Sequence, residues 1–501
     1  MLPPRALSWF TPMPPQRNGI ADYSAKLLQA IAPLHASHVY CHDLAIGLPA
    51  GVELRDPAQA FRHLGASSPI LHQIGNNGGH VFALEALRAY GGVVSLHDLS
   101  LLYLYELASP RLEEILGRMT GPTGKMGQAY ARHWRENRIK TAANYVLFDL
   151  IGEILALARR VIVHSHYARN KIAAIYGSEA SSKIDVIPHF APVLSIAGEE
   201  AARAAIGYEY AVPLVLTSGF ATKAKRFDWL VEALDELARR GTDFRWIHAG
   251  EERASEFDLS GAIAGRPSLA GRCQITGYVS EEALDSYIAA ADVVVNLRFP
   301  SVGESSGTLA RAFAAGRCCI VNDTAAYAEL PRDAVVHLPV FGTVPALADA
   351  LEGLLAHPEL RAIFGERARL LAQTDLAMDQ VARSYLATVA NAYPSGRTMP
   401  ATAARTTPAA THHRLSGKAS SDTDIIRLGQ EVGLKRGDFE LELSFAGLDD
   451  FAELARSTPA LLREALPAHV TLDSIRFLAG SSGTGIGLAI RGRSHTLERT
   501  A

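Results

Sequence analysis

"VPLVLTSGFATKAKRFDWLVEALDELARR", residues 212–240, contains the pattern that decides the fold. It begins with a mostly apolar run of the length of a buried strand, and Gly219 ends that run. From residue 226 onward, large apolar side chains recur every three or four positions, which is typical of an amphipathic helix. A buried strand that leads directly into such a helix is the first half of a βαβ unit in a parallel sheet.

The same strand-then-helix rhythm occurs in two series along the chain. In the first series "ALSWF", "PILHQIG", "GVVSLHD" and "RVIVHS" alternate with longer amphipathic stretches, and in the second "FRWIHAGEE", "CQITGYV", "DVVVNLR", "RCCIVND" and "AVVHL" follow the quoted stretch. We therefore predict an α/β protein with two tandem Rossmann-like, doubly wound domains, residues 1–195 and 196–378. A cleft between two such domains is a natural ligand site.

The composition changes after residue 394. Residues 396–423 are rich in Pro, Thr, Ala and Ser and poor in large apolar residues, so we predict a disordered linker there. Beyond it, "FELELSFAGL", "VTLDSIRFLAG" and "GIGLAIRGR" resemble strands, and "DDFAELARSTPALLREALP" is amphipathic. Residues 424–501 are therefore expected to form a small α+β module, whose role the sequence does not assign.

Composition excludes several classes of function. The 501 residues are 48% hydrophobic and carry a formal net charge of -3, without a basic block that could follow a phosphate backbone, so nucleic acid is not an expected partner. The four cysteines show no C-x-x-C spacing, which disfavours a zinc knuckle or a disulfide framework. No signal-peptide pattern and no run of 18 apolar residues is present. We expect a cytoplasmic protein, and a peripheral contact with the inner face of a membrane stays open.

Two glycine-containing loops follow predicted strands and open helices, where backbone N–H groups and the helix dipole favour an anion. In the first, Gly19 precedes Asp22 and Ser24, and the alternative reading is a turn glycine with an ordinary helix cap. In the second, Gly219 precedes Lys223, Lys225 and Arg226. Cations at a helix N-terminus oppose its dipole unless an anion lies nearby, although a solvated basic face would also explain them.

A third such stretch is "FPSVGESSGTLARAFAAGRCCIV", residues 299–321. A helix that begins near Ser305 offers free N–H groups to a phosphate, while Glu304 can accept hydrogen bonds from hydroxyl groups. A sugar nucleotide satisfies both needs. The alternative is that Glu304 simply caps the helix, since the dipole favours an acidic residue there.

These stretches together resemble a known family. The motifs, in chain order, are "PPQRNGIADYS", "QIGNNGGHVFALEAL", "VVSLHDLSLLYLY", "VIVHSHYARNKI", "VIPHF", "GFATKAKRFDWLVEAL", "GYVSEEALDSYIAAADVVVNLRFPSVGESSGTLARAFAAGRCCIVND" and "AELP". Over residues 5 to about 390, the chain resembles bacterial family 4 retaining glycosyltransferases. The resemblance implies the GT-B architecture of two Rossmann-like domains, and a last helix, residues 379–395, that packs back onto the first domain.

The resemblance also implies roles for individual residues. Glu304 would hydrogen-bond the donor sugar, Lys225 would face the donor diphosphate in the same pocket, and His97 would lie beside the transferred sugar. Gly19 would approach the diphosphate. The remaining donor-binding positions would be Gly219, Arg226, Gly277, Tyr278, Val279, Ser305, Ser306 and Gly307, with residues 277–279 at the nucleotide base.

Two positions depart from the family pattern. Phe220 stands where an arginine usually follows the strand glycine, so one diphosphate cation is missing unless Lys223 or Arg226 replaces it. Ala312 stands where the second acid of the family's E-x7-E motif would be, which leaves the ribose diol without its usual carboxylate.

The implied reaction is retaining, metal-independent transfer of a sugar from a GDP- or UDP-sugar donor to a glycan or lipid-linked acceptor, in cell-envelope or exopolysaccharide synthesis. No cofactor other than the donor substrate is expected. The "DTD" of residues 422–424 has the form of a metal motif but lies in the predicted linker, so we assign it to solvent. Two alternatives stay open: a catalytically silent sugar-nucleotide or polysaccharide sensor, favoured by Ala312, and a sugar-nucleotide epimerase on the same architecture.

Overall fold

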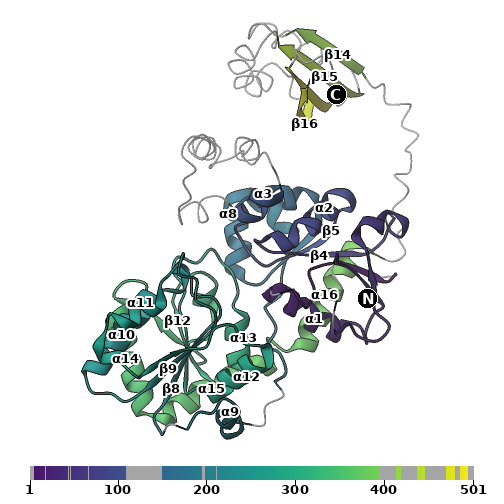
Figure 1. Cartoon of the computed structure of the whole chain (residues 1–501). Coiled ribbons are helices and arrows are strands. Elements are labelled where there is room, and N and C mark those ends of the chain that lie inside the picture. The colour runs from purple at the N-terminus through teal and green to yellow at the C-terminus, as the bar shows by residue number, and fades with distance from the viewer. Residues whose placement is uncertain are drawn as a thin grey trace, which may run out of the picture. The chain divides into compact units, whose positions relative to one another are not determined.

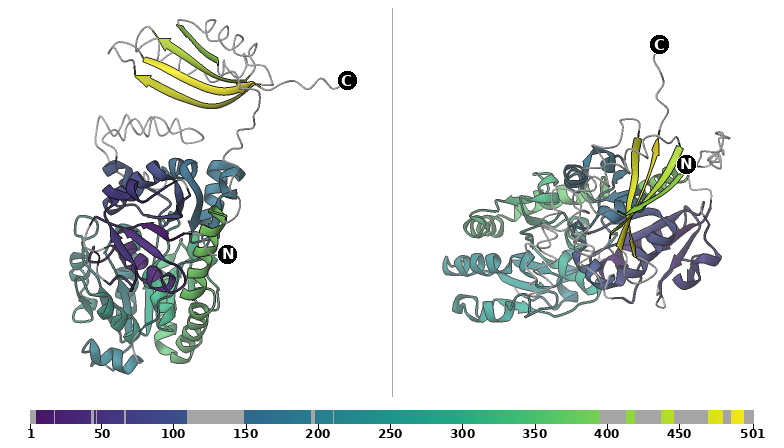
Figure 2. Two further views of the ribbon diagram at one scale, coloured as in Figure 1. Left: turned by 90° about the vertical axis from the view of Figure 1, so that its right-hand side faces the viewer. Right: turned by 90° about the horizontal axis from the view of Figure 1, so that it is seen from above.

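The computed structural model describes residues 5–16, 18–42, 45, 47–65, 67–108, 149–194, 198–209 and 211–394, and four strands within residues 413–494. The chain divides into two compact units, Met1–Gly396 and Arg397–Ala501. The first unit contains the two α/β domains, which Figures 1 and 2 show from three sides.

The first α/β domain is built on a seven-stranded sheet in the order β3-β2-β1-β4-β5-β6-β7, with every neighbouring pair parallel. Its strands are β1 (Leu7–Phe10), β2 (Ser37–Tyr40), β3 (Glu53–Arg55), β4 (Ile70–Ile74), β5 (Gly92–Leu96), β6 (Ala158–Val163) and β7 (Ile184–Val186). Its helices are α1 (Gly19–Ile31), α2 (Val81–Tyr90), α3 (Leu102–Ala108), α7 (Gly152–Leu157) and α8 (His166–Ser182), with 3-10 turns η1 (Pro57–Arg62) and η2 (Gly78–His80).

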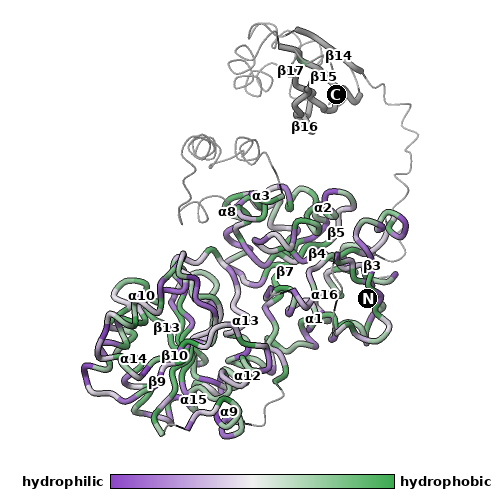
Figure 3. Tube along the Cα trace, in the orientation of Figure 1, coloured by the Kyte–Doolittle hydropathy of each residue, from purple (hydrophilic) through white to green (hydrophobic). Residues whose placement is uncertain are grey.

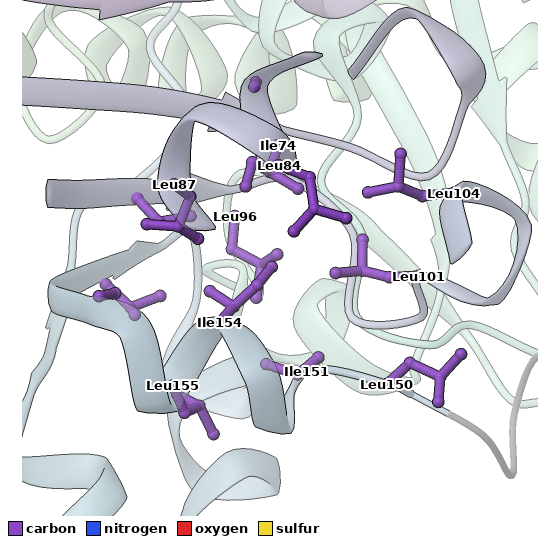
Figure 4. Close-up of a cluster of buried hydrophobic side chains, with 14 of the residues drawn as sticks. Ile74, Leu84, Leu87, Leu96, Leu101, Leu104, Leu150, Ile151, Ile154 and Leu155 are labelled. Atoms are coloured by element: carbon purple, nitrogen blue, oxygen red, sulfur yellow. The ribbon is translucent and has the colours of Figure 1, made fainter. Parts of the chain in front are cut away.

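Both faces of this sheet are buried. Along β4, Ile70 and Ile74 pack into the cluster under α2 and α7, which Figure 4 shows, whereas Leu71 packs into the cluster under α1. This alternation is the period of two that a strand imposes on its side chains. Because each face carries its own helices, the strands read as nearly continuous apolar runs.

The second α/β domain has a six-stranded parallel sheet in the order β10-β9-β8-β11-β12-β13. Its strands are β8 (Leu214–Ser218), β9 (Arg245–Ala249), β10 (Cys273–Ile275), β11 (Val293–Asn296), β12 (Cys318–Asn322) and β13 (Val336–Leu338). Its helices are α9 (Glu199–Ala205), α10 (Phe227–Arg239), α11 (Leu259–Ala264), α12 (Glu281–Ala290), α13 (Gly307–Ala314), α14 (Thr343–Ala356) and α15 (Pro358–Gln373), with 3-10 turns η3 (Lys223–Lys225), η4 (Pro267–Leu269) and η5 (Ala325–Glu329).

Two apolar clusters again cover the two faces of this sheet. On β11, Val293 and Val295 contribute to one cluster and Val294 to the other. The hydrophobic strands run through the middle of the domain in Figure 3, as the sequence rhythm predicts. The four cysteines of the chain, all within the described residues, are free thiols.

Helix α16 (Met378–Ala392) returns to the first α/β domain after the second one is complete. It packs against α1, β5 and β6. The Tyr385 hydroxyl lies 2.7 Å from the Ser95 hydroxyl and 2.9 Å from the Tyr23 hydroxyl, and Tyr385 is fully buried. The helix expected over residues 379–395 is therefore present, and its packing ties the end of the first unit to its beginning.

The second unit contains a four-stranded sheet in the order β14-β15-β17-β16. Its strands are β14 (His413–Lys418), β15 (Gly437–Phe445), β16 (Val470–Ala479) and β17 (Ile486–Ser494). The last three are the strands expected from alternation, but residues 413–418 were assigned to a disordered linker, which is wrong. Strand β14 pairs in parallel with β15 along its whole length. Its backbone hydrogen bonds therefore form a strand that its polar sequence does not predict. The helix expected within residues 449–467 and the "DTD" motif lie outside the described residues.

Among the described residues, no helix combines the length and the hydropathy needed to span a bilayer.

Candidate donor-binding site

A cavity of about 280 Å³ lies between the two α/β domains. The first domain and the hinge contribute Gly19, Asp22, Tyr23, Lys26, His189, Phe190 and Pro192; the second contributes Gly219, Phe220, Ala249, Gly250, Glu251, Tyr278, Val279, Glu281, Leu284, Gly307, Thr308 and Arg311. Five of the positions predicted from the sequence therefore line one space: Gly19, Gly219, Tyr278, Val279 and Gly307.

Gly19 begins α1 and leaves open space in front of the helix. The helix is capped by Asn18, whose side-chain oxygen accepts from the Ile20 N–H at 3.0 Å. Asp22 lies in the first turn and faces the cavity. A Cβ atom at Gly19 would meet nothing within 4 Å. The structure therefore leaves room for a ligand at this helix start.

Residue 219 has to be a glycine both because of its backbone conformation and because of the nearby Lys225 side chain. Its φ of +76° lies in the left-handed region, and a Cβ there would come within 2.7 Å of the Lys225 ammonium. The same ammonium donates to the Ser218 carbonyl at 2.7 Å. Burial of the ammonium, aided by the positive charges of Arg298 and Arg253, lowers the pKa of Lys225 well below its usual value. An anion bound nearby would stabilise the protonated, charged form of Lys225.

Arg226 does not reach the cavity. It pairs with Asp228 at 2.5 Å, and its guanidinium carbon lies 3.8 Å from the centre of the Trp229 ring. Arg226 also has a left-handed φ of +51°, at the point where the chain turns from η3 into α10. The prediction that it binds the donor is not supported, because this turn directs its side chain to a local partner.

Two arginines that the sequence analysis missed lie beside Lys225. Arg253 lies over the face of Phe220, with its guanidinium carbon 3.7 Å from the ring centre. Arg298, directly beyond β11, pairs with Glu304 at 3.5 Å and is also close enough to lower the pKa of Lys225. Arg253 and Arg298 thus place two further cations near the position where Phe220 stands in place of the arginine of the family pattern.

Glu304 is held in a turn and is not the cap of α13. Its Oε2 accepts from the Val302 N–H at 3.0 Å, the Gly303 N–H at 3.1 Å and the Ser301 hydroxyl at 3.0 Å. The cap is Ser306, so α13 begins at Gly307 instead of near Ser305. The alternative reading of Glu304 as an acidic cap is therefore wrong.

Lys225 and Glu304 do not line the same cavity. Glu304, with Ser305 and Ser306, borders a second cavity of about 320 Å³, which touches a different face of α13 from the first. Lys225 borders a small recess that it shares with Ser218 and Arg298. The prediction that the two side chains face one pocket is corrected: Arg298 lies between them and links the two.

His97 is enclosed in a network of neutral side chains. It lies 2.6 Å from the Gln73 side-chain oxygen and 3.2 Å from His164, and burial lowers its pKa well below the usual value. Its neighbour Asp98, which the sequence analysis passed over, accepts from the Asn76 N–H at 2.8 Å. Burial raises the pKa of Asp98 to about 6, with a smaller contribution from the charge of Glu304. Carboxylates from both domains therefore approach one another here.

A charged cluster lines part of the first cavity. Glu281, at the start of α12, pairs with Lys26 of the first domain at 3.0 Å and with Arg311 of α13. Arg311 also pairs with Asp285 at 2.5 Å. Burial and the charge of Glu281 raise the pKa of Asp22 to about 6. The cluster joins the two domains across the cavity.

Comparison with known proteins finds similarity to glycosyltransferases. Residues 212–357 match the family described as glycosyl transferases group 1. The chain is 33% identical over 199 residues to an alpha-D-kanosaminyltransferase of Streptomyces kanamyceticus, which covers 38% of this chain. It is 30% identical over 229 residues to a D-inositol 3-phosphate glycosyltransferase of Nocardia farcinica, which covers 44% of this chain. The chain spans about half the length of each of these relatives, 50% in both cases.

A solved structure shares the fold of the first unit. Anabaena HepE in complex with UDP and glucose superimposes with a TM-score of 0.54 at 14% identity, covering 77% of this chain and all of that one. The two-domain GT-B fold predicted from the sequence is thereby confirmed.

Proposed function

We propose that the chain is a retaining glycosyltransferase that moves a sugar from a GDP- or UDP-sugar to a glycan or lipid-linked acceptor, in cell-envelope or exopolysaccharide synthesis. The observation that carries this proposal is the interdomain cavity, at which Gly19, Gly219 and the start of α13 converge. The match of the second domain and the glycosyltransferase names of the relatives support it. A nucleotide-sugar donor is also supported by the UDP and glucose bound to HepE.

The base, the diphosphate and the sugar of the donor would each contact a different part of the site. Tyr278 and Val279 border the cavity at the end proposed for the base, and Gly277 precedes them with a left-handed φ of +73°. The diphosphate would lie at the N-terminal ends of α1 and α13, where free N–H groups favour an anion. The sugar would extend toward Glu304 and Asp98, whose carboxylates accept hydrogen bonds from hydroxyl groups.

The site is suited to stabilise a departing diphosphate. In the proposed reaction the bond from the anomeric carbon to the diphosphate oxygen breaks, a bond to the acceptor oxygen forms on the same face, and the acceptor proton passes to the departing phosphate. Negative charge therefore grows next to Lys225, Arg298 and the two helix starts. Positive charge fixed in advance at that place stabilises the transition state more than the ground state. We propose that this charge makes a metal ion unnecessary.

The sensor alternative rested on Ala312, and the structure gives it no separate support. The position is buried in the core of the domain, and other carboxylates, Asp22 and Glu281, line the cavity beside it. We therefore retain catalysis as the function that the geometry favours.

A turnover assay with the purified full chain tests the proposal. Panels of UDP- and GDP-sugars would be incubated with mono-, oligo- and lipid-linked saccharides, with and without a chelator in excess. We expect one donor to be consumed only when an acceptor is present, at the same rate with chelator, and the anomeric configuration in the product to match that in the donor. Donor binding without turnover on any acceptor would favour a sensor, and inverted product would contradict retention.

A further inference from the structure

The surface of α13 that faces the cavity carries no carboxylate. Thr308 and Arg311 line the cavity, whereas Ala312 is fully buried in the apolar cluster between the sheet, α13 and α15. A ligand in this cavity therefore meets a hydroxyl and a guanidinium from α13. If the ligand carries a vicinal diol, its acceptor has to come from another element.

Glu281 is the carboxylate that this geometry supplies. It begins α12, two residues after Val279, and its side chain is 32% exposed and lines the same cavity. Its two oxygens are fixed separately, since Oε2 pairs with Lys26 at 3.0 Å and Oε1 pairs with Arg311. A carboxylate has about four lone-pair positions. Two lone-pair positions of the Glu281 carboxylate therefore stay available to a ligand. Lys26 and Arg311 fix the orientation of this carboxylate before the ligand binds.

Asp22 lines the cavity too but is less suited to a diol beside the base. It lies one turn from Gly19 on α1, and so on the opposite domain from Tyr278 and Val279. Glu281 lies at the base end, where a ribose connects the two parts of a nucleotide.

We propose that Glu281 binds the 2′- and 3′-hydroxyls of the donor ribose, and that Arg311 and Lys26 hold its carboxylate for this purpose. The proposal rests on the proposed function, because it assigns one subsite of the nucleotide donor. It makes Glu281 a specificity-determining residue that selects ribonucleotides over 2′-deoxyribonucleotides. It also joins donor binding to the contact between the domains, since Lys26 belongs to the first domain and Arg311 to the second.

Calorimetric titration of the full chain with matched nucleotides tests the role. UDP and GDP would be compared with their 2′-deoxy counterparts in the wild type, in Glu281→Gln and in the control Glu282→Gln, which is exposed on the same helical turn and does not line the cavity. Loss of a hydrogen bond to a charged acceptor is worth on the order of 10-fold to 100-fold in affinity. We expect the wild type and Glu282→Gln to prefer the ribonucleotide by at least about 10-fold, and Glu281→Gln to lose most of that preference.

The ratio of the two affinities separates ligand contact from a structural role. Loosening of the ion pairs of Glu281 would weaken both nucleotides equally and leave the ratio unchanged. A wild type that binds both forms equally, or a Glu281→Gln variant that keeps the full preference, would overturn the role of Glu281 while leaving the proposed function intact. Failure of every nucleoside diphosphate to bind the wild type would overturn both.

Discussion

Replacing Lys225 with methionine is expected to lower kcat/KM for the donor by about 100-fold to 1,000-fold, the range seen when one fixed donor to a developing anion is removed. Methionine keeps an unbranched side chain of nearly the same length, and it removes the charge together with the hydrogen bond to the Ser218 carbonyl. The ammonium is enclosed and bonded to the Ser218 carbonyl, and it lies directly beside Gly219, which lines the cavity proposed for the diphosphate. Because the folded state disfavours the charged form of this lysine, the variant should unfold at the same temperature as the wild type or a higher one.

Lys223→Met is the matched control for this loss. Lys223 lies two residues earlier in the same turn, η3, and its side chain is exposed. Steady-state kinetics and thermal unfolding of both variants would be measured with the donor identified in the turnover assay. Activity of Lys225→Met within about threefold of the control would show that this lysine does not face the reacting phosphate.

Replacing Glu304 with glutamine is expected to lower kcat by about 100-fold and to spare the affinity for the free nucleoside diphosphate. The turn needs one oxygen that accepts from Val302, Gly303 and Ser301, and the amide oxygen of glutamine can still do so. The second oxygen, which lies 3.5 Å from Arg298, becomes a donor and can no longer accept from a sugar hydroxyl. The loss should therefore concern the sugar only.

The affinities of Glu304→Gln for two ligands distinguish a contact with the sugar from an effect on the protein. Titrations of Glu304→Gln with the nucleoside diphosphate and with the complete nucleotide sugar would separate the sugar contact from the phosphate contact. We expect wild-type affinity for the diphosphate and weakened affinity for the nucleotide sugar. Equal weakening of both ligands would show that Glu304 acts by shaping the start of α13 and does not touch the sugar.

Local pattern was enough to predict the two sheets, whereas the donor-binding roles of the cavity glycines came from the family resemblance. Apolar runs that end in glycine mark a strand followed by a loop whatever the rest of the chain does. In parallel sheets these loops gather at one edge, which is consistent with the common ligand that the family resemblance implied for Gly19, Gly219 and Gly307. The strand His413–Lys418 was missed because its six residues carry almost no apolar signal of their own.

The charged residues of the site depend on contacts that no local pattern contains. Arg253 reaches Phe220 from the loop after β9, and Arg298 links Lys225 to Glu304 from the loop after β11. Glu281 meets Lys26 only because the two domains close on one another. Arg226 shows the converse, since a favourable position in the sequence was overridden by a left-handed turn that pairs it with Asp228.

The central claim is that the space in front of Gly19 receives the donor diphosphate. Gly19→Val tests it most directly, because a Cβ added at this position meets no protein atom within 4 Å, and we expect the fold to stay unchanged. Gly353→Val is the control, since an added Cβ in α14 also meets nothing and lies outside the cavity.

Calorimetric titration with UDP and GDP, together with thermal unfolding, would be carried out on the wild type and both variants. We expect the wild type and Gly353→Val to bind one nucleoside diphosphate equally well, and Gly19→Val to bind it at least about 10-fold more weakly while unfolding at the wild-type temperature. Wild-type affinity in Gly19→Val would contradict the claim, because the anion would then have to bind elsewhere.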